Sequence, residues 1–287
     1  MSLCFFVSDL HGKLERYQKL FQQIKKRQPF AVFMGGDLLP KRGYVFQKRE
    51  ITTTNFLEKY FLAELQKLKE NLGTAYPRFL VILGNDDPRS SEIILQQAEA
   101  EGLLEYINEK WTNLDGYEIC GYSYVPPTPF LFKDWEKYDV SRFVDVGCVS
   151  PLQGFRSVPK QIEQIKYGTI KKDLQKLTKM HSMDKTILLF HAPPYQTKLD
   201  RAALDGQMVD YAPLDVHVGS IAIQEFIWEK QPRLTLHGHV HESAGITGSW
   251  RQQLGNTLAI SAAYDGPELA LVVFDLEKIE TAERLLI

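Results

Sequence analysis

Short runs of consecutive apolar residues recur along this chain, and a polar residue or a glycine follows each of them. Runs that are apolar throughout, instead of alternating with polar residues, are typical of strands buried on both faces. The clearest runs are Leu3 to Val7, Ala31 to Met34, Phe79 to Leu83, Thr186 to Phe190 and Leu234 to Leu236. Two more predicted strands, between Thr257 and Leu276, lie on either side of a turn at Asp265-Gly266-Pro267.

Between these runs, apolar residues recur at helical spacing, so that they fall on one face of a helix. Ser220 stands where it can cap the last of these predicted helices. The four apolar faces consist of Leu14, Tyr17, Leu20, Phe21 and Ile24; Leu57, Phe61, Leu65, Leu68 and Leu72; Ile162, Ile165, Ile170, Leu174 and Leu177; and Ile221, Ile223, Phe226 and Ile227. The alternation of strands and helices predicts an α/β fold with parallel strand pairing.

The stretch from Tyr122 to Ser150 differs from the rest, because it has weak periodicity and contains Pro126-Pro127-Thr128-Pro129-Phe130. We interpret it as an ordered loop insertion at the rim of a site; a plain surface connection is the alternative. The chain shows no linker, internal repeat or low-complexity segment. We therefore expect a single domain over residues 1–287.

The composition is that of an ordinary globular protein, with 44% hydrophobic residues, 24% charged residues and a formal net charge of −2 over 287 residues. This balance gives no support to general binding of nucleic acid or membrane surfaces by charge. No stretch approaches the ~20 apolar residues of a membrane span. Cys4, Cys120 and Cys148 are sparse and lack metal-type spacing, which is typical of reduced thiols. We expect a cytoplasmic protein.

Five short polar motifs follow the five clearest strands, within a few residues of each strand end. In open α/β sheets, ligands collect at the carboxyl ends of the strands. Asp, His and Asn side chains bind first-row transition metals, and seven of them are enough to hold two ions. The motifs are Asp9-Leu10-His11, Gly36-Asp37, Gly84-Asn85-Asp86-Asp87, His191 and Gly238-His239-Val240-His241.

Each motif also has a simpler explanation when it is taken alone. Asp9 after a strand is more often a helix cap, and His191 before Ala192-Pro193-Pro194 can be an ordinary loop residue. The pair His239 and His241 is harder to explain by packing, because two alternate imidazoles between a glycine and an apolar strand rarely serve a core. The five motifs together favour a metal site.

The ordered set of motifs resembles that of the calcineurin-like metallophosphoesterases, and the resemblance runs from the first strand to beyond residue 241. It implies an α/β fold in which a two-sheet β-sandwich is flanked by helices in four layers, α-β-β-α. It also implies two divalent metal ions, with Asp37 bridging them; Mn, Fe, Zn and Ni all suit this ligand set. Carried over by position, the ligands are Asp9, His11 and His241 for the first metal, and Asn85, His191 and His239 for the second.

The chain departs from the family pattern at Asp86, where members usually have a histidine that assists protonation of the leaving group. An ionised aspartate only accepts hydrogen bonds and repels a phosphate. Either its pKa is raised so that it donates a proton, or Asp86 has another role. His217, which Asp215 can orient, is a second candidate for a catalytic role at the rim, and a structural role for it is equally compatible with the sequence. We expect a structural role for His237.

The resemblance implies a metal-dependent phosphoesterase, in which a hydroxide shared by the metals attacks the substrate. With Asp86 in place of the histidine, we favour a phosphodiesterase that acts on a small phosphodiester or nucleotide. The alternatives are a phosphomonoesterase or nucleotidase, and a metal-binding protein-interaction scaffold of the same fold. A repair nuclease is disfavoured, because the chain has no basic stripe and no obvious DNA-capping domain.

Overall fold

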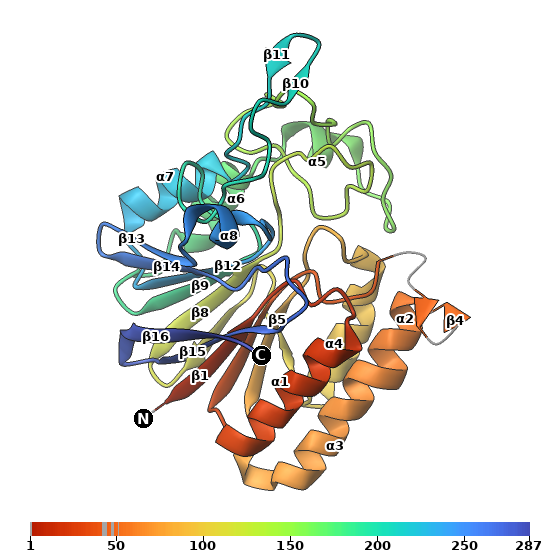
Figure 1. The fold of residues 1–287 in the computed structure, drawn as a ribbon, viewed down its shortest axis with the longest axis vertical. Helices are drawn as coiled ribbons and strands as arrows, with labels where there is room; N and C mark the ends of the chain where they lie inside the picture. Colours follow the sequence, from red (N-terminus) through yellow and green to blue (C-terminus); the bar gives the residue numbers. More distant parts are fainter. Residues whose placement is uncertain (1, 42–44, 47–48, 51) are drawn as a thin grey trace.

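The computed structural model describes residues 2–41, 45–46, 49–50 and 52–287. Two six-stranded sheets lie face to face, as Figure 1 shows. The first sheet contains, in spatial order, β16 (Lys278–Leu286), β15 (Ala270–Asp275), β1 (Leu3–Val7), β2 (Ala31–Gly35), β5 (Arg78–Ile82) and β6 (Glu105–Tyr106). The second contains β13 (Arg251–Leu254), β14 (Thr257–Ser261), β12 (Leu234–His237), β9 (Thr186–Phe190), β8 (Tyr117–Tyr122) and β7 (Trp111–Leu114).

Both sheets are mixed. The strands β1, β2, β5 and β6 are parallel to one another, as are β8, β9, β12 and β14. Antiparallel strands complete the edges: β15 and β16 in the first sheet, and β7 and β13 in the second. The carboxyl ends of the central parallel strands therefore meet at one edge of the sandwich.

Helices cover the outer faces of the sandwich (Figure 1). The first sheet carries α1 (Leu14–Arg27), α2 (Thr53–Phe56), a π-helical segment η1 (Leu57–Leu62), α3 (Ala63–Leu72) and α4 (Glu92–Ala100). The second carries α6 (Ile170–Thr178), α7 (Ile221–Lys230) and α8 (Ser243–Thr247), while α5 (Ile162–Tyr167), which buries none of its residues, lies among the loops above the sheets. Short elements complete the fold: η2 (Gly73–Ala75), η3 (Arg89–Ser91), β3 (Val45–Phe46) with β4 (Arg49–Glu50), and the projecting hairpin β10 (Met208–Val209) and β11 (Ala212–Pro213).

The apolar runs are continuous because both faces of each central strand are buried. Phe6 packs between the sheets with residues such as Leu189, whereas its neighbour Phe5 packs outward against the helical layer with Tyr17. All four side chains are almost completely inaccessible to solvent. The structure confirms the predicted two-sheet sandwich flanked by helices.

One predicted helix differs from the structure. The periodicity from Ile162 to Leu177 suggests one helix, but the chain forms two, because Gly168 is extended and Thr169 caps α6 by accepting a hydrogen bond from Lys172 N. The two strands predicted between Thr257 and Leu276 are confirmed as β14 and β15, which belong to different sheets. The predicted cap at Ser220 is confirmed, since its Oγ accepts from Ile223 N at 3.1 Å.

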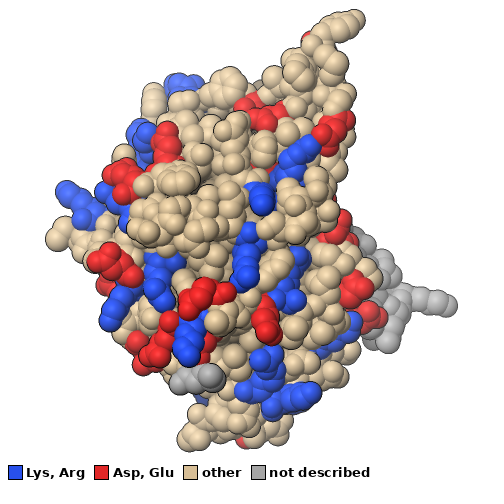
Figure 2. Space-filling view, turned by 60° about the vertical axis from the view of Figure 1, so that its left-hand side comes forward, with Lys and Arg blue, Asp and Glu red and all other residues tan. Residues whose placement is uncertain are grey.

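The strand β8 escapes a search for apolar runs because Glu118 and Gly121 interrupt it. Gly121 is required there: a Cβ atom at this position would lie 2.4 Å from Ile82 Cγ2 of the facing sheet. Among the described residues, no helix is long and apolar enough to cross a bilayer. Figure 2 shows Lys and Arg side chains interspersed with Asp and Glu on the face that it displays.

Candidate metal centre

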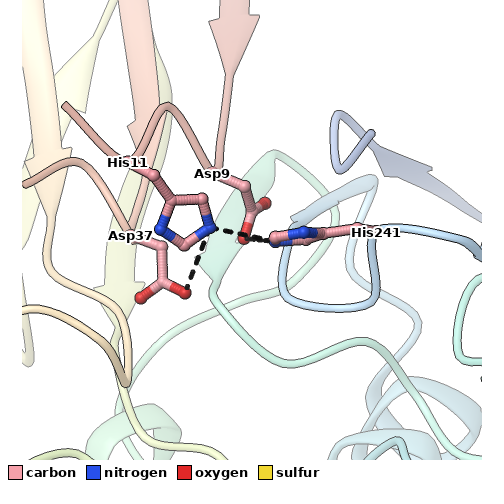
Figure 3. A group of neighbouring side chains, drawn as sticks. All are labelled: Asp9, His11, Asp37 and His241. Carbon is pink, nitrogen blue, oxygen red and sulfur yellow. Dashed lines mark hydrogen bonds and ion pairs between the residues drawn. The ribbon is translucent and has the colours of Figure 1, made fainter. Parts of the chain in front are cut away.

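Parallel strands bring the predicted ligands to one edge of the sandwich. Asp9 and His11 follow β1, and Asp37 follows the adjacent strand β2. His241 reaches the same point from the second sheet, after β12. Figure 3 shows the imidazole of His11 between the Asp37 carboxylate and the His241 ring.

These four residues, Asp9, His11, Asp37 and His241, form a compact cluster in which one ligand atom from each lies within 4.8 Å of all the others. His11 Nε2 lies 3.1 Å from His241 Nε2 and 4.0 Å from Asp37 Oδ2. His241 Nε2 in turn lies 3.2 Å from Asp9 Oδ1. Two imidazole nitrogens and two carboxylates thus converge on one small volume.

A second group of donors surrounds the other oxygen of Asp37. His191 Nε2 lies 3.5 Å from Asp37 Oδ1 and 3.0 Å from Asn85 Oδ1. The rings of His191 and His239 have centroids 5.3 Å apart. His191 Nδ1 donates to Gly35 O at 2.8 Å, which directs Nε2 toward the site. The structure therefore brings all seven predicted ligand positions together around Asp37.

The backbone at this edge is held in an unusual conformation. Asp9, His11, Asp37 and His239 have φ angles of 57°, 47°, 51° and 74°, in the left-handed region that non-glycine residues rarely adopt. Such strain persists only where the surrounding structure imposes it, and it clusters at functional sites. Four of the seven converging residues share this conformation, which supports the hypothesis of a functional site at this edge.

Two motif glycines are needed because the chain passes very close to the carboxylates. A Cβ atom on Gly84 would lie 2.3 Å from Asp37 Oδ1. One on Gly238 would lie 2.6 Å from Asp9 Oδ2 and 2.0 Å from Ser8 Oγ. All three distances are far below van der Waals contact. Any side chain at either glycine would therefore displace a candidate ligand.

The ionisable groups of the site have shifted pKa values. Burial lowers the pKa of His11 to about 4 and that of His239 to about 3, so these two imidazoles are neutral and free to coordinate. Burial also opposes the charged forms of His191 and His241, but the charge of Asp37 raises the pKa of His191 to about 10, and the hydrogen bond with Asp9 raises the pKa of His241. Burial alone would raise the pKa of Asp9, but the hydrogen bond from His241 and its charge outweigh burial and lower the pKa to about 2. Burial likewise opposes ionisation of Asp37, yet the charge of His191 holds its pKa well below the usual range.

The donor set fits a divalent transition metal. Buried carboxylates stay ionised at neutral pH when a cation compensates them, and neutral imidazoles are borderline donors that such metals bind. His11 Nε2 and His241 Nε2 also face one another across 3.1 Å, an arrangement that a shared cation stabilises. The residues present therefore match the group that the motif pattern implies.

Comparison with solved structures places this arrangement among known folds. The crystal structure of TT1561 of Thermus thermophilus matches with a TM-score of 0.60 at 17% identity, covering 99% of this chain and 98% of that chain. A dimetal phosphatase from Danio rerio matches with a TM-score of 0.50 at 11% identity, covering 94% and 91%. No protein-family model and no curated protein matches the sequence. This chain has the calcineurin-like metallophosphoesterase fold.

Within this metallophosphoesterase fold, Asp86 lies beside the first cluster. Its Oδ2 is 3.7 Å from His11 Nδ1, and its backbone N–H donates to Asp37 Oδ1 at 2.8 Å. Burial, reinforced by the charge of Asp37, raises the pKa of Asp86. Lys41 Nζ lies 2.7 Å from Asp86 Oδ2 and forms an ion pair with it. Asp86 thus lines the cavity over the converging donors, where it forms an ion pair with Lys41.

Two other histidines, His217 and His237, make their contacts outside the converging donors. His217 Nδ1 lies 2.8 Å from Oδ1 of the buried Asp200. The prediction that Asp215 orients this ring is wrong, because Asp215 Oδ1 accepts from the backbone N–H of His217 instead. Val218, and not His217, lines the cavity over the converging donors in the part of the chain that the structure describes. His237 lies within hydrogen-bond distance of Ala192 O and Thr235 Oγ1, at 2.8 Å from each.

The sequence did not reveal the roles of three supporting residues. Lys41 belongs to none of the five motifs. Asp87 is fully buried and accepts hydrogen bonds from the N–H groups of Gly84, Leu38 and Leu39, which ties the third motif to the second. Arg16, buried on α1, donates to Asp9 O at 2.7 Å and to Gly266 O at 2.5 Å. The sequence offered one indication of the role of Arg16, namely its position beside the apolar face of a predicted helix.

A cavity of about 320 Å³ opens over the converging donors. Asp37, Asn85 and His241 lie along its wall, and Pro126 to Phe130 with Cys148 line it from the stretch with weak periodicity. Glu136, buried beneath that stretch, accepts from Thr128 N at 2.8 Å and binds Lys133. The proline-rich segment is thus anchored from below and lines the space in front of the candidate ligands.

Proposed function

We propose that this chain is a dimetal phosphoesterase that hydrolyses a small phosphodiester or nucleotide. The observation that carries the proposal is the convergence of seven Asp, His and Asn side chains around Asp37. They arise from five strand ends and two sheets, and no packing role accounts for so many polar donors at one point. The fold shared with a dimetal phosphatase supports the same conclusion.

In this proposal, Asp9, His11 and His241 would hold one metal, Asn85, His191 and His239 would hold the other, and Asp37 would contribute to both. Mn, Fe, Zn and Ni all suit such mixed nitrogen and oxygen ligands. When bound, a metal pair polarises the phosphoryl oxygens and lowers the pKa of water at the site.

The chain supplies the remaining parts of the site. The Asp37 carboxylate is fixed by the N–H of Asp86 and by the close passage of Gly84, so the donors are held in place before the substrate arrives. Lys41 offsets the charge of Asp86 and presents a cation to the anionic substrate. The Pro126 to Phe130 segment lines one wall of the cavity.

A diester preference follows from Asp86. Without the family's histidine, the site has a weaker proton donor for poor leaving groups, and diesters with good leaving groups tolerate that loss better. Burial and the charge of Asp37 raise the pKa of Asp86, which favours its protonated, donating form relative to an exposed aspartate. We propose no catalytic part for His217, whose ring is held by Asp200.

Initial rates on a chromogenic phosphate diester and the matching monoester, measured with added Mn²⁺ and with chelator, test this function. The expected result is turnover that chelator abolishes and that is faster on the diester. Asp37→Asn should abolish turnover, whereas Asp184→Asn, a change at an exposed aspartate outside the site, should not. Turnover that survives chelation, or no turnover on either ester by protein with both metals bound, would contradict the proposal and favour a scaffold.

A further inference from the structure

A second cavity adjoins the one over the metal centre. It also measures about 320 Å³, and the two cavities share Lys41 and Asp86 as lining residues. The ion pair between these residues therefore lies where the cavities meet. A substrate whose phosphate contacts the metal-binding edge can extend past this pair into the second cavity.

Among the described residues, two aromatic rings line the second cavity. The rings of Phe132 and Phe155 pack with centroids 5.4 Å apart and an interplanar angle of 39°. Two prolines and three hydroxyl-bearing residues also line it: Pro40, Pro88, Thr53, Ser90 and Ser157. Aromatic faces with a few polar groups are typical of pockets that bind small organic ligands, and they favour flat rings.

Arg156 adds a positive charge to this cavity. Its Nη2 donates to Pro151 O at 2.8 Å, and among the described side chains no ion pair engages its guanidinium. A guanidinium held in this way can lie against an aromatic ring or donate to ring oxygens and nitrogens. Nucleobases combine both features, a flat ring and hydrogen-bond acceptors.

We propose that the second cavity binds a flat aromatic group, such as a nucleobase, attached to the phosphate of the substrate. This inference rests on the proposed function, since it needs the phosphate at the metal centre. The substrate class then narrows to aromatic phosphoesters, with Phe132 and Phe155 as the ring-binding surface and Arg156 as the cation that contacts the ring or its acceptors.

Binding of two phosphonates to the manganese-loaded protein, measured by calorimetry, tests this assignment. Methylphosphonate probes the metal centre alone, and 1-naphthylmethylphosphonate adds a flat ring. Wild-type protein should bind the naphthyl compound more tightly. Phe155→Ala should weaken naphthyl binding about five- to tenfold, a typical cost for a lost aromatic contact, and leave methylphosphonate binding unchanged. Phe155 is 48% exposed, so this change removes little core packing.

Phe143→Ala is the matched control, because Phe143 is 68% exposed and lines neither cavity in the part of the chain described. Arg156→Gln is a second variant and should also reduce the preference for the naphthyl compound. Equal affinity of wild-type protein for both compounds, or a preference that survives both Phe155→Ala and Arg156→Gln, would overturn this inference and leave the proposed function intact. Failure of methylphosphonate to bind the metal-loaded protein would instead count against the proposed function, and this inference would fall with it.

Discussion

Lys41 Nζ lies 2.7 Å from Asp86 Oδ2, so the residue that stands where the calcineurin-like metallophosphoesterases have a histidine is half of an ion pair. Lys41 is 61% exposed, and an exposed pair contributes little to stability. In the proposed function, a phosphate that enters the site would meet a carboxylate whose charge Lys41 offsets. We therefore expect the pair to affect substrate binding and proton supply more than folding.

Asp86→His should raise activity on esters with poor leaving groups. An imidazole at this position, beside His11 and the substrate, restores a proton donor and removes a negative charge; the gain should reach up to about 10²-fold. The measurement is kcat over diesters of graded leaving-group pKa. Asp86→Asn, which removes the charge without supplying a donor, is the control. No gain in Asp86→His with its metals bound would refute the idea of a missing acid.

Lys41→Met should raise KM for an anionic ester about fivefold at low salt, because one positive charge leaves the cavity. Added salt should shrink the difference, since the Lys41 side chain is exposed and its charge is screened. Combining the change with Asp86→Asn should recover part of the loss. A KM that stays unchanged at low ionic strength would show that Lys41 takes no part in binding.

Gly84→Ala should reduce metal affinity by more than about tenfold, because the new methyl group would push the Asp37 carboxylate or the His191 ring out of position. Metal content after dialysis against a weak chelator is the readout. Gly245→Ala in α8 is the control, as nothing lies within 4 Å of a Cβ atom there. Equal metal retention by the two variants would contradict the close-approach argument.

The carboxyl group of Asp139, which lies outside the candidate metal site, should make the stability of the protein depend on pH. It accepts from Ser220 Oγ and Ile221 N at the start of α7, each at 2.6 Å, and burial raises its pKa to about 6. The folded-state pKa lies above the ordinary value near 3.8, so the stability that the protonated carboxyl contributes is present below pH 3.8 and lost as the pH rises through 6.

Asp139→Asn should therefore gain stability relative to wild type between about pH 4 and pH 7, by up to about 3 kcal/mol. Urea unfolding of both proteins at the two pH values measures this difference. If the free-energy difference between them is the same at both pH values, Asp139 does not titrate on folding.

The strand ends were predictable from the sequence because continuous apolar runs place Asp9, Asp37 and His191 directly after buried strands. The partner of His217 was not predictable: the local pattern offers Asp215, whereas the fold brings Asp200 to the ring. The role of Lys41 was not predictable for the same reason, because it depends on a tertiary contact with Asp86, which is distant in the sequence. Local spacing thus identified the donors, and tertiary contacts decided which charges surround them.

We propose that two metals bound at these seven residues drive phosphoester hydrolysis. The most direct test adds Mn²⁺ stepwise to metal-free protein and records bound metal and initial diester rate together. We predict that the rate rises with occupancy and levels off at two bound ions per chain, and that Asp37→Asn neither binds two ions nor turns over. Full activity without metal, or a single saturating ion, would contradict it.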